Sequence, residues 1–217
     1  MCEASAVYAW IKEVPAMTET KLIYDALAAI IRATKPDISS WIVGGSAGLM
    51  LRGLPLTAEP RDLDIYCDEE DVFPVYEALK QYAVDVPALS ITGMYRSTLC
   101  HFRIEGVWVE VVGGFQVAAA GCRYVTAVRE LLIPFGDVIP LEDSPDAVAV
   151  VPLAHELWFN LLRERADRVE LIAEAFAADP DRHEGALQAI EAGNSFTCDA
   201  KSVIRRILTR GKAGGDV

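Results

Sequence analysis

Two short stretches decide the fold of this chain: Trp41-Ile42-Val43-Gly44-Gly45-Ser46 and Arg61-Asp62-Leu63-Asp64-Ile65-Tyr66. The first predicts an apolar strand that ends in a Gly-Gly-Ser corner, where backbone N–H groups and a hydroxyl suit a phosphate. The second predicts a strand, and because side chains alternate along a strand, its two aspartates share one face. Neighbouring carboxylates repel each other unless a cation lies near them. The two stretches together indicate a metal site beside a phosphate site.

A third acid, Glu110, lies in the otherwise apolar run 107–112. A carboxylate buried there without a partner would be costly. If this run pairs with the Asp-x-Asp strand, Glu110 meets Asp62 and Asp64, and three carboxylates can bind one or two Mg²⁺ ions through oxygen. Such ions can activate an attacking hydroxyl and neutralise a pyrophosphate that leaves. The pattern therefore favours chemistry on a nucleoside triphosphate.

Hydrophobic periodicity predicts an α+β fold, in which a mixed sheet with flanking helices is followed by a helical C-terminal region. We expect an α/β domain over 1–150 and the helical region over 151–217. Expected strands cover 38–43, 62–67, 98–104, 107–112 and 147–151. Expected helices cover 18–34, 46–52, 69–83, 153–165, 167–178, 182–192 and 199–210. In 113–145, rich in Gly, Ala and Pro, we expect one helix around 124–132.

Composition limits the partners and the compartment. The 217 residues include 20 basic and 32 acidic side chains, a net charge of −12 that disfavours nucleic acid and anionic membranes unless a local basic patch overrides it. Five scattered cysteines without C-x-x-C spacing indicate neither a zinc module nor a disulfide framework. There is no apolar signal-peptide core and no run of the roughly 18–20 apolar residues that span a bilayer. We expect a cytoplasmic protein with no membrane partner.

Each motif has a simpler explanation when it is taken alone. Most Gly-Gly pairs are turns, and acids at strand ends are often solvated. Asp-x-Asp also occurs in haloacid-dehalogenase phosphatases, but there a small hydroxyl residue follows, whereas Ile65-Tyr66 follows here. The three histidines are expected to be structural or solvated. Only the order of the motifs, each on a suitable element, favours a nucleotide site.

That order, V-G-G-S, then D-L-D-I, then V-E-V, resembles the DNA polymerase β-like nucleotidyltransferase superfamily. The chain is most similar to the small bacterial branch that holds antibiotic adenylyltransferases and abortive-infection-type toxin nucleotidyltransferases. The resemblance covers residues 38–112 and extends weakly into 152–170. It implies a nucleoside triphosphate as co-substrate and Mg²⁺ as cofactor.

The resemblance also implies a role for each site residue. The Gly-Gly-Ser corner would cradle the triphosphate, the two aspartates would hold the metal ions, and the glutamate would bind the catalytic metal or act as base toward the acceptor hydroxyl. A basic side chain just before the second strand is a further candidate for the phosphates. The candidate cofactor-binding residues are Gly44, Gly45, Ser46 and Arg61; the candidate catalytic and metal-binding residues are Asp62, Asp64 and Glu110.

The implied reaction is transfer of a nucleoside monophosphate, with AMP from ATP expected first, to a hydroxyl on a small molecule, a protein or a tRNA. The acidic net charge favours a cationic small molecule, but tRNA stays open. Many relatives carry a lysine in the first C-terminal helix where this chain has Asn160, so Arg163, Arg165 or Arg168 would have to substitute. This departure leaves an alternative: a non-catalytic nucleotide-binding or protein-interaction module of the same fold. The nucleobase, the acceptor and the oligomeric state stay open.

Overall fold

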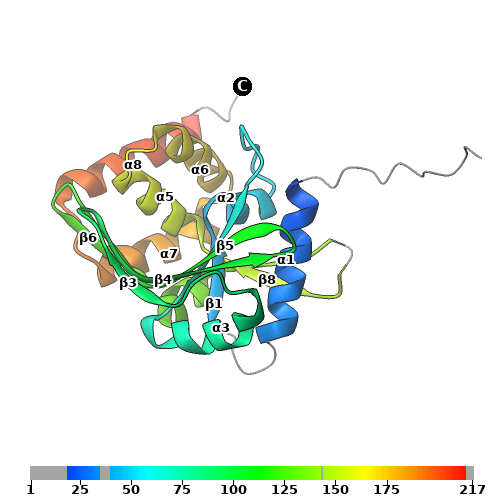
Figure 1. Ribbon diagram of the computed structural model, residues 1–217. Coiled ribbons are helices and arrows are strands. Elements are labelled where there is room, and N and C mark those ends of the chain that lie inside the picture. Colours follow the sequence, from blue (N-terminus) through cyan, green and yellow to red (C-terminus); the bar gives the residue numbers. More distant parts are fainter. Residues whose placement is uncertain (1–18, 35–39, 143, 214–217) are drawn as a thin grey trace, which may run out of the picture.

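The computed structural model describes residues 19–34, 40–142 and 144–213. A mixed sheet of eight strands lies at the centre, with helices on both of its faces, as the sequence predicts for an α+β fold (Figure 1). Along the sheet the strands are ordered β3-β4-β5-β2-β1-β8-β7, and β6 pairs with β5. Their bounds are β1 (Trp41–Gly44), β2 (Asp62–Cys67), β3 (Ala88–Ile91), β4 (Tyr95–Ile104), β5 (Val107–Ala119), β6 (Cys122–Val125), β7 (Asp137–Pro140) and β8 (Ala147–Val150).

The helices fall into two groups along the chain. Helices α1 to α4 are interspersed among the strands, whereas α5 to α8 follow one another after β8, as expected for a helical C-terminal region. Their bounds are α1 (Glu19–Thr34), α2 (Gly45–Leu51), α3 (Val72–Leu79), α4 (Ile133–Phe135), α5 (Leu153–Leu162), α6 (Ala166–Ala178), α7 (Pro180–Gly193) and α8 (Cys198–Ala213). The shorter turns are η1 (Glu69–Asp71), η2 (Lys80–Tyr82) and the π-helical η3 (Val128–Leu132).

Strand β2 lies between β1 and β5 in the sheet. It runs antiparallel to β1, with Asp64 opposite Gly44, and parallel to β5, with Asp64 opposite Glu110. Residues that pair in register on neighbouring strands direct their side chains to the same face of the sheet. The register therefore places the Asp-x-Asp pattern, the glycine corner and the third acid around one point of the sheet.

Each face of the sheet has its own hydrophobic core. On one face α1 and α3 pack through residues such as Leu27 and Leu79 against β2, where Leu63 is fully buried. On the other face (Figure 1) α5 packs against β5, and α6, α7 and α8 join α5 in one apolar cluster that includes Tyr66 and the far half of β5. Because these helices and strands share one apolar cluster, the packing is continuous across the expected boundary near residue 150.

Several elements differ from the expectations. Residues 124–125 belong to β6 and not to a helix; the helical turns begin only at Val128. The reason is that β5 continues to Ala119 and folds back through Ala120-Gly121, both at positive φ (50° and 74°), to pair with β6. The expected helix 69–83 is regular only over α3, and β3 was not expected. Residues 38 and 39 of the expected first strand lie outside the described residues, and β1 begins at Trp41.

No helix in the parts of the chain that the structure describes has the length and apolar character needed to cross a membrane.

Candidate active site

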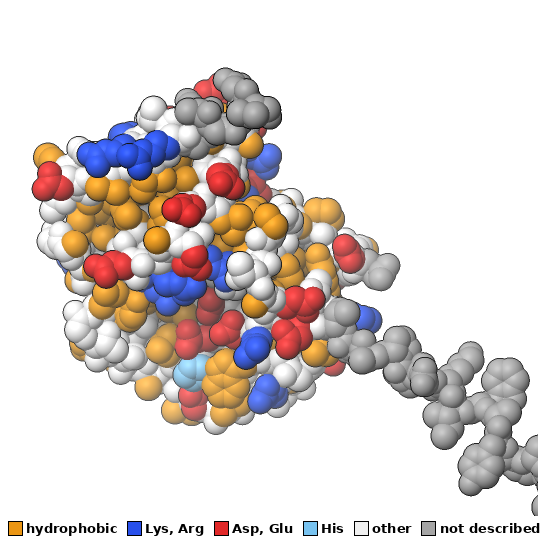
Figure 2. All heavy atoms as spheres, turned by 90° about the horizontal axis from the view of Figure 1, so that it is seen from above, with side chains coloured by type: hydrophobic (Ala, Val, Ile, Leu, Met, Phe, Trp, Pro, Cys, Tyr) orange, Lys and Arg blue, Asp and Glu red, His pale blue; other side chains and the backbone are white. Residues whose placement is uncertain are grey.

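A cavity of about 490 Å³ lies between helix α2, strands β2, β4 and β5, and helices α5 and α6. Of the residues predicted from the sequence, its wall contains Gly45, Ser46, Asp62, Asp64 and Glu110. Gly44 and the exposed Arg61 lie outside the wall. Acidic and basic side chains gather in the hollowed middle of one face of the molecule (Figure 2). The rest of the wall is formed by Leu49, Tyr66, Ser90, Thr92, Tyr95, Ser97, Leu99, Val112, Phe115, Glu156, Phe159, Asn160, Arg163, Arg165 and Arg168.

The three predicted acids act on one another electrostatically. The pKa of Asp64 is raised to about 7, first because burial removes water from its carboxylate and next because of the charges of Asp62 and Glu110. Glu156 raises this pKa further, and Arg163 partly offsets the shift. The cavity therefore concentrates negative charge around Asp64, which a bound cation would relieve.

The glycine corner is shaped by its neighbours on β2. Gly45 has a φ of +62°, and a Cβ atom there would lie 2.1 Å from Oδ2 of Asp64. A Cβ on Gly44 would lie 2.3 Å from Cε2 of Tyr66, so this glycine is needed for packing rather than for lining the cavity. The absence of side chains at both positions lets the corner approach the Asp-x-Asp strand closely.

The backbone of the corner is held by an acid that sequence reasoning missed. The N–H of Gly45 donates a hydrogen bond to Oε1 of Glu156 (2.7 Å). Nδ2 of Asn160 donates to Oε2 of the same carboxylate (3.1 Å). Glu156 is only 1% exposed. Burial raises its pKa to about 7, against the effect of these hydrogen bonds. Asn160, near where the sequence resemblance implies a lysine, therefore supports a carboxylate instead of supplying a charge.

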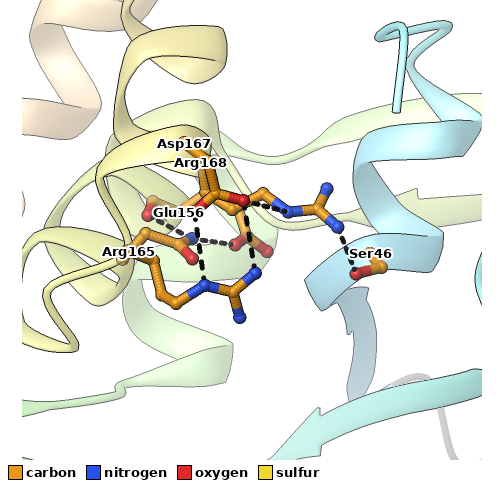
Figure 3. Close-up of polar contacts among 6 residues, drawn as sticks. Ser46, Glu156, Arg165, Asp167 and Arg168 are labelled. Atoms are coloured by element: carbon orange, nitrogen blue, oxygen red, sulfur yellow. Dashed lines mark hydrogen bonds and ion pairs between the residues drawn. The ribbon is translucent and has the colours of Figure 1, made fainter. Parts of the chain in front are cut away.

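Three arginines bring positive charge to the same wall. Arg168, on α6, donates from Nη2 to Oγ of Ser46 at the start of α2 (3.2 Å), as Figure 3 shows. Its Nη1 is buried and has no hydrogen-bond partner within the described parts of the chain. Arg165 contacts Asp167 (3.3 Å), and the guanidinium of Arg163 lies 4.7 Å from the ring centre of Phe159. The unused donor of Arg168 beside Ser46 suits an anionic oxygen.

His101, on β4, contacts the third acid from outside the cavity wall. Its Nε2 lies 3.1 Å from Oε1 of Glu110, and its Nδ1 lies 2.6 Å from Oδ2 of Asp85. Burial acts to lower the pKa of His101, but the hydrogen bonds and charges of the two carboxylates raise it overall. Sequence reasoning treated this histidine as structural or solvated. A signal was present, because a tight turn at Glu105-Gly106 sets His101 opposite Glu110.

The donor set suits a hard divalent cation, since the acids offer carboxylate oxygens and Asp64 carries a raised pKa. Within residues 19–34, 40–142 and 144–213, however, no three His, Cys, Asp or Glu side chains are grouped so that they could hold a metal ion by themselves. Glu110 is engaged by His101 instead. Mg²⁺ commonly takes one or two protein carboxylates and completes its shell with phosphate oxygens and waters. Asp62 and Asp64 therefore fit Mg²⁺ in company with a nucleotide.

Comparison with known proteins finds similarity at the level of structure. No family model matches the chain, and no curated protein matches it. A Thermotoga maritima protein with a proposed nucleotidyltransferase function, TM1012, is 23% identical with a TM-score of 0.52, over 69% of this chain and 85% of that one. The antibiotic-resistance factor ANT(2'')-Ia is 13% identical, with a TM-score of 0.45 over 80% and 91% of the two chains. The lincosamide antibiotic adenylyltransferase LnuA is 13% identical, with a TM-score of 0.36; the match covers 61% of this chain and 85% of LnuA.

Proposed function

We propose that this chain, which has the fold of the polymerase β-like nucleotidyltransferases, is an enzyme that transfers a nucleoside monophosphate from its triphosphate to a hydroxyl acceptor. The observation that carries the proposal is the pairing of Asp64 with Glu110 across β2 and β5, directly beside the Gly45-Ser46 corner. The raised pKa of Asp64 supports a site built for a cation. The reaction releases pyrophosphate and forms a phosphate ester.

Asp62 and Asp64 would hold Mg²⁺. The ion would supply charge neutralisation at the phosphates and activation of the attacking hydroxyl. The two aspartates differ in their exposure. Asp62 is exposed at the mouth of the cavity, whereas Asp64 is less exposed and lies against the corner. This arrangement leaves Asp64 as the residue on which the metal site depends most.

The triphosphate would lie along Ser46 and the arginines of the wall. Arg168 is already at Oγ of Ser46 and keeps a buried donor without a partner among the described residues. Arg163 and Arg165 add charge nearby. These side chains would take over the role that a lysine has in relatives, since Asn160 binds Glu156 here. An arginine also binds phosphate through two parallel hydrogen bonds, which a lysine does not.

Glu110 would accept the proton of the acceptor hydroxyl or bind the catalytic metal. The base role is favoured because Oε1 of Glu110 is engaged by His101. A positioned base contributes about 10²–10⁴-fold to a reaction rate.

The acceptor is a small molecule, a protein side chain or the end of a tRNA. The net charge of −12 favours a cationic small molecule. ATP is the first candidate donor. The described cysteines form no disulfide, in keeping with the cytoplasmic location that we propose.

An alternative is a nucleotide-binding or protein-interaction module that does not turn over. Two features favour it: Glu156 occupies the N–H of Gly45, and Asn160, near where the sequence resemblance implies a lysine, is neutral and bonds to Glu156. A carboxylate at the corner repels phosphate, so binding requires Glu156 to be protonated or to move.

The two functions differ in one experiment. The protein is incubated with Mg²⁺ and ATP, GTP, CTP or UTP, together with tobramycin, tRNA or a serine-containing peptide, and pyrophosphate release is measured beside binding of each nucleotide. An enzyme releases pyrophosphate with at least one pair, and omission of Mg²⁺ abolishes the release. Binding of Mg²⁺-nucleotide without release for every pair would establish the module and contradict the enzyme.

A further inference from the structure

We infer that His101 is a positioning residue that orients Glu110 for the transfer reaction. The inference rests on the proposed function, because it assigns a task within the same site. It goes further in separating Glu110 from the two aspartates: Glu110 is held by an imidazole and acts on the acceptor, while Asp62 and Asp64 act on the metal. His101 belongs to none of the sequence motifs that define the site.

Hydrogen bonds on both sides hold the imidazole ring of His101 in place. Asp85 accepts from both the backbone N–H of His101 (2.7 Å) and ring Nδ1 (2.6 Å), so one carboxylate fixes the residue at two points. The other ring nitrogen is then directed at Oε1 of Glu110 (3.1 Å). A histidine held on one side by a carboxylate presents its second nitrogen in a set direction. The chain Asp85–His101–Glu110 leads from the surface to the cavity wall.

The backbone of β4 and β5 also supports the Asp85–His101–Glu110 contacts. His101 and Glu110 are register partners on β4 and β5, joined through the tight turn at Glu105-Gly106. The ring also packs on Trp108 of β5, with 5.2 Å between ring centres. Because β5 is in turn paired with β2, the register that brings Glu110 beside Asp64 also brings His101 to its other side.

The contact between His101 and Glu110 contributes too little to the free energy of unfolding for stability to explain it. The side chains of His101 and Glu110 are 23% and 34% exposed, and ion pairs at such positions contribute about 1 kcal/mol or less. Only Oε1 of Glu110 is engaged in the described structure, and its other oxygen accepts no hydrogen bond from the residues that are described. An acid fixed through one oxygen at the cavity wall, with the other left over, is suited to accept a proton from an acceptor hydroxyl.

The test uses two substitutions that separate the hydrogen bond from the ring. His101→Phe keeps a ring against Trp108 but cannot bond to Glu110, whereas His101→Gln keeps an N–H donor with a similar reach. We expect kcat for pyrophosphate release to fall about 10–100-fold in His101→Phe, the range seen when a supporting hydrogen bond is lost. In His101→Gln we expect most of the rate to be kept. KM for the triphosphate should be unchanged in both, because Glu110 does not bind the nucleotide.

A second comparison shows whether His101 acts through Glu110. His101→Phe is introduced into Glu110→Gln, where we expect it to cause no further loss of kcat. The inference is overturned if His101→Phe keeps the wild-type rate, if His101→Gln is as slow as His101→Phe, or if His101→Phe lowers kcat equally in both backgrounds. Thermal unfolding of each variant shows that the fold is kept. If wild-type protein releases no pyrophosphate with any triphosphate, the proposed function itself fails, and this inference falls with it.

Discussion

Gly45 is the residue at which backbone conformation and site chemistry meet. Its φ of +62° lies in the left-handed region, and the position of a Cβ atom there is taken by Oδ2 of Asp64 at 2.1 Å. Its N–H is donated to Glu156. A side chain at this position would therefore disturb both the corner and the acid on which the metal site depends.

Gly45→Ala has a matched control in Gly53→Ala. Gly53 also has a positive φ (+76°), but its Cβ would meet nothing within 4 Å. The left-handed conformation costs each alanine about 1–2 kcal/mol. We expect Gly45→Ala to lose more stability than Gly53→Ala and, in addition, to lose turnover, since Asp64 must shift. Urea unfolding and pyrophosphate release check this. Equal turnover in the two variants would show that the corner does not depend on Gly45.

Glu156 makes the free energy of unfolding depend on pH, in a direction that follows from its raised pKa. Its pKa is raised from 4.5 to about 7, so the folded chain keeps a proton that the unfolded chain has lost between these values. The free energy of unfolding therefore falls as pH rises through this window. Gln at this position cannot ionise, and it can still accept from the N–H of Gly45.

We expect Glu156→Gln to be more stable than wild type at about pH 8, by on the order of 3 kcal/mol from the size of the shift, and to differ little at about pH 4. The pKa of Asp64 is raised as well, so the stability of the variant still depends on pH to some extent. Urea unfolding of both proteins at the two pH values measures the difference. The same difference at both values would contradict the assigned cause.

At the scale of elements, α2 is held at both ends. It begins at the glycine corner, and at its far end Arg52 donates from Nη2 to the carbonyl of Val151 (2.5 Å) and pairs with Asp137 on β7. The Arg52 side chain is buried in this contact. Asp137 also pairs with Arg182, which is largely exposed. The position of the corner therefore depends on the strands at the edge of the sheet.

The two arginines provide a matched pair. We expect Arg52→Met to lower the free energy of unfolding by about 3 kcal/mol, because a buried partner and its bonds to carbonyls are lost. Arg182→Met should cost about 1 kcal/mol or less, as exposed ion pairs do. Arg52→Met should also weaken nucleotide binding, since α2 carries Ser46. Calorimetric titration and urea unfolding would measure both effects, and equal losses in the two variants would argue against a role for the buried pair.

The core elements of the site follow from local patterns. The Gly-Gly-Ser corner, the Asp-x-Asp strand and the hairpin around Glu105-Gly106 are each specified within a few residues, and together they place Glu110 beside Asp64. The far part of β5, β6 and the exposed edge strand β3 were missed although each pairs with its neighbour along the chain, β3 with β4 and the far part of β5 with β6. In β3 no residue is fully buried, so its sequence has no alternating apolar face to indicate a strand.

The rest of the site depends on contacts over long stretches of chain. Glu156 binds Gly45, and Arg168 binds Ser46, across more than a hundred residues. No spacing rule predicts such a contact. A partial signal existed for Glu156, which is an acid in a largely apolar helix, as Glu110 is an acid in a largely apolar strand. An acid in a largely apolar helix or strand is therefore a candidate site residue even before the fold is known.

At the scale of the whole molecule, the C-terminal helices and the sheet share one core. Trp158 is fully buried on α5 and stacks on Phe196, with 3.8 Å between ring centres. The same cluster includes Tyr66 and Phe115 of the sheet. The helical region therefore closes the cavity as part of the fold.

We expect Trp158→Ala to lower the free energy of unfolding by about 3–5 kcal/mol, because a large cavity is left in the shared core. Sheet and helices should still unfold in one transition, since their packing is continuous. Circular dichroism and tryptophan fluorescence during urea unfolding report on this. Two separate transitions in the wild-type protein would instead show that 1–150 and 151–217 fold independently.

The proposed nucleotidyl transfer depends on Asp64, which is held against the glycine corner and beside Glu110. The direct measurement is transfer of label from triphosphates labelled at the α-phosphate, compared between wild type, Asp64→Asn and the exposed control Asp181→Asn. We predict that wild type and Asp181→Asn transfer the label, and that Asp64→Asn remains folded but transfers none. Transfer by Asp64→Asn at the wild-type rate would contradict the account.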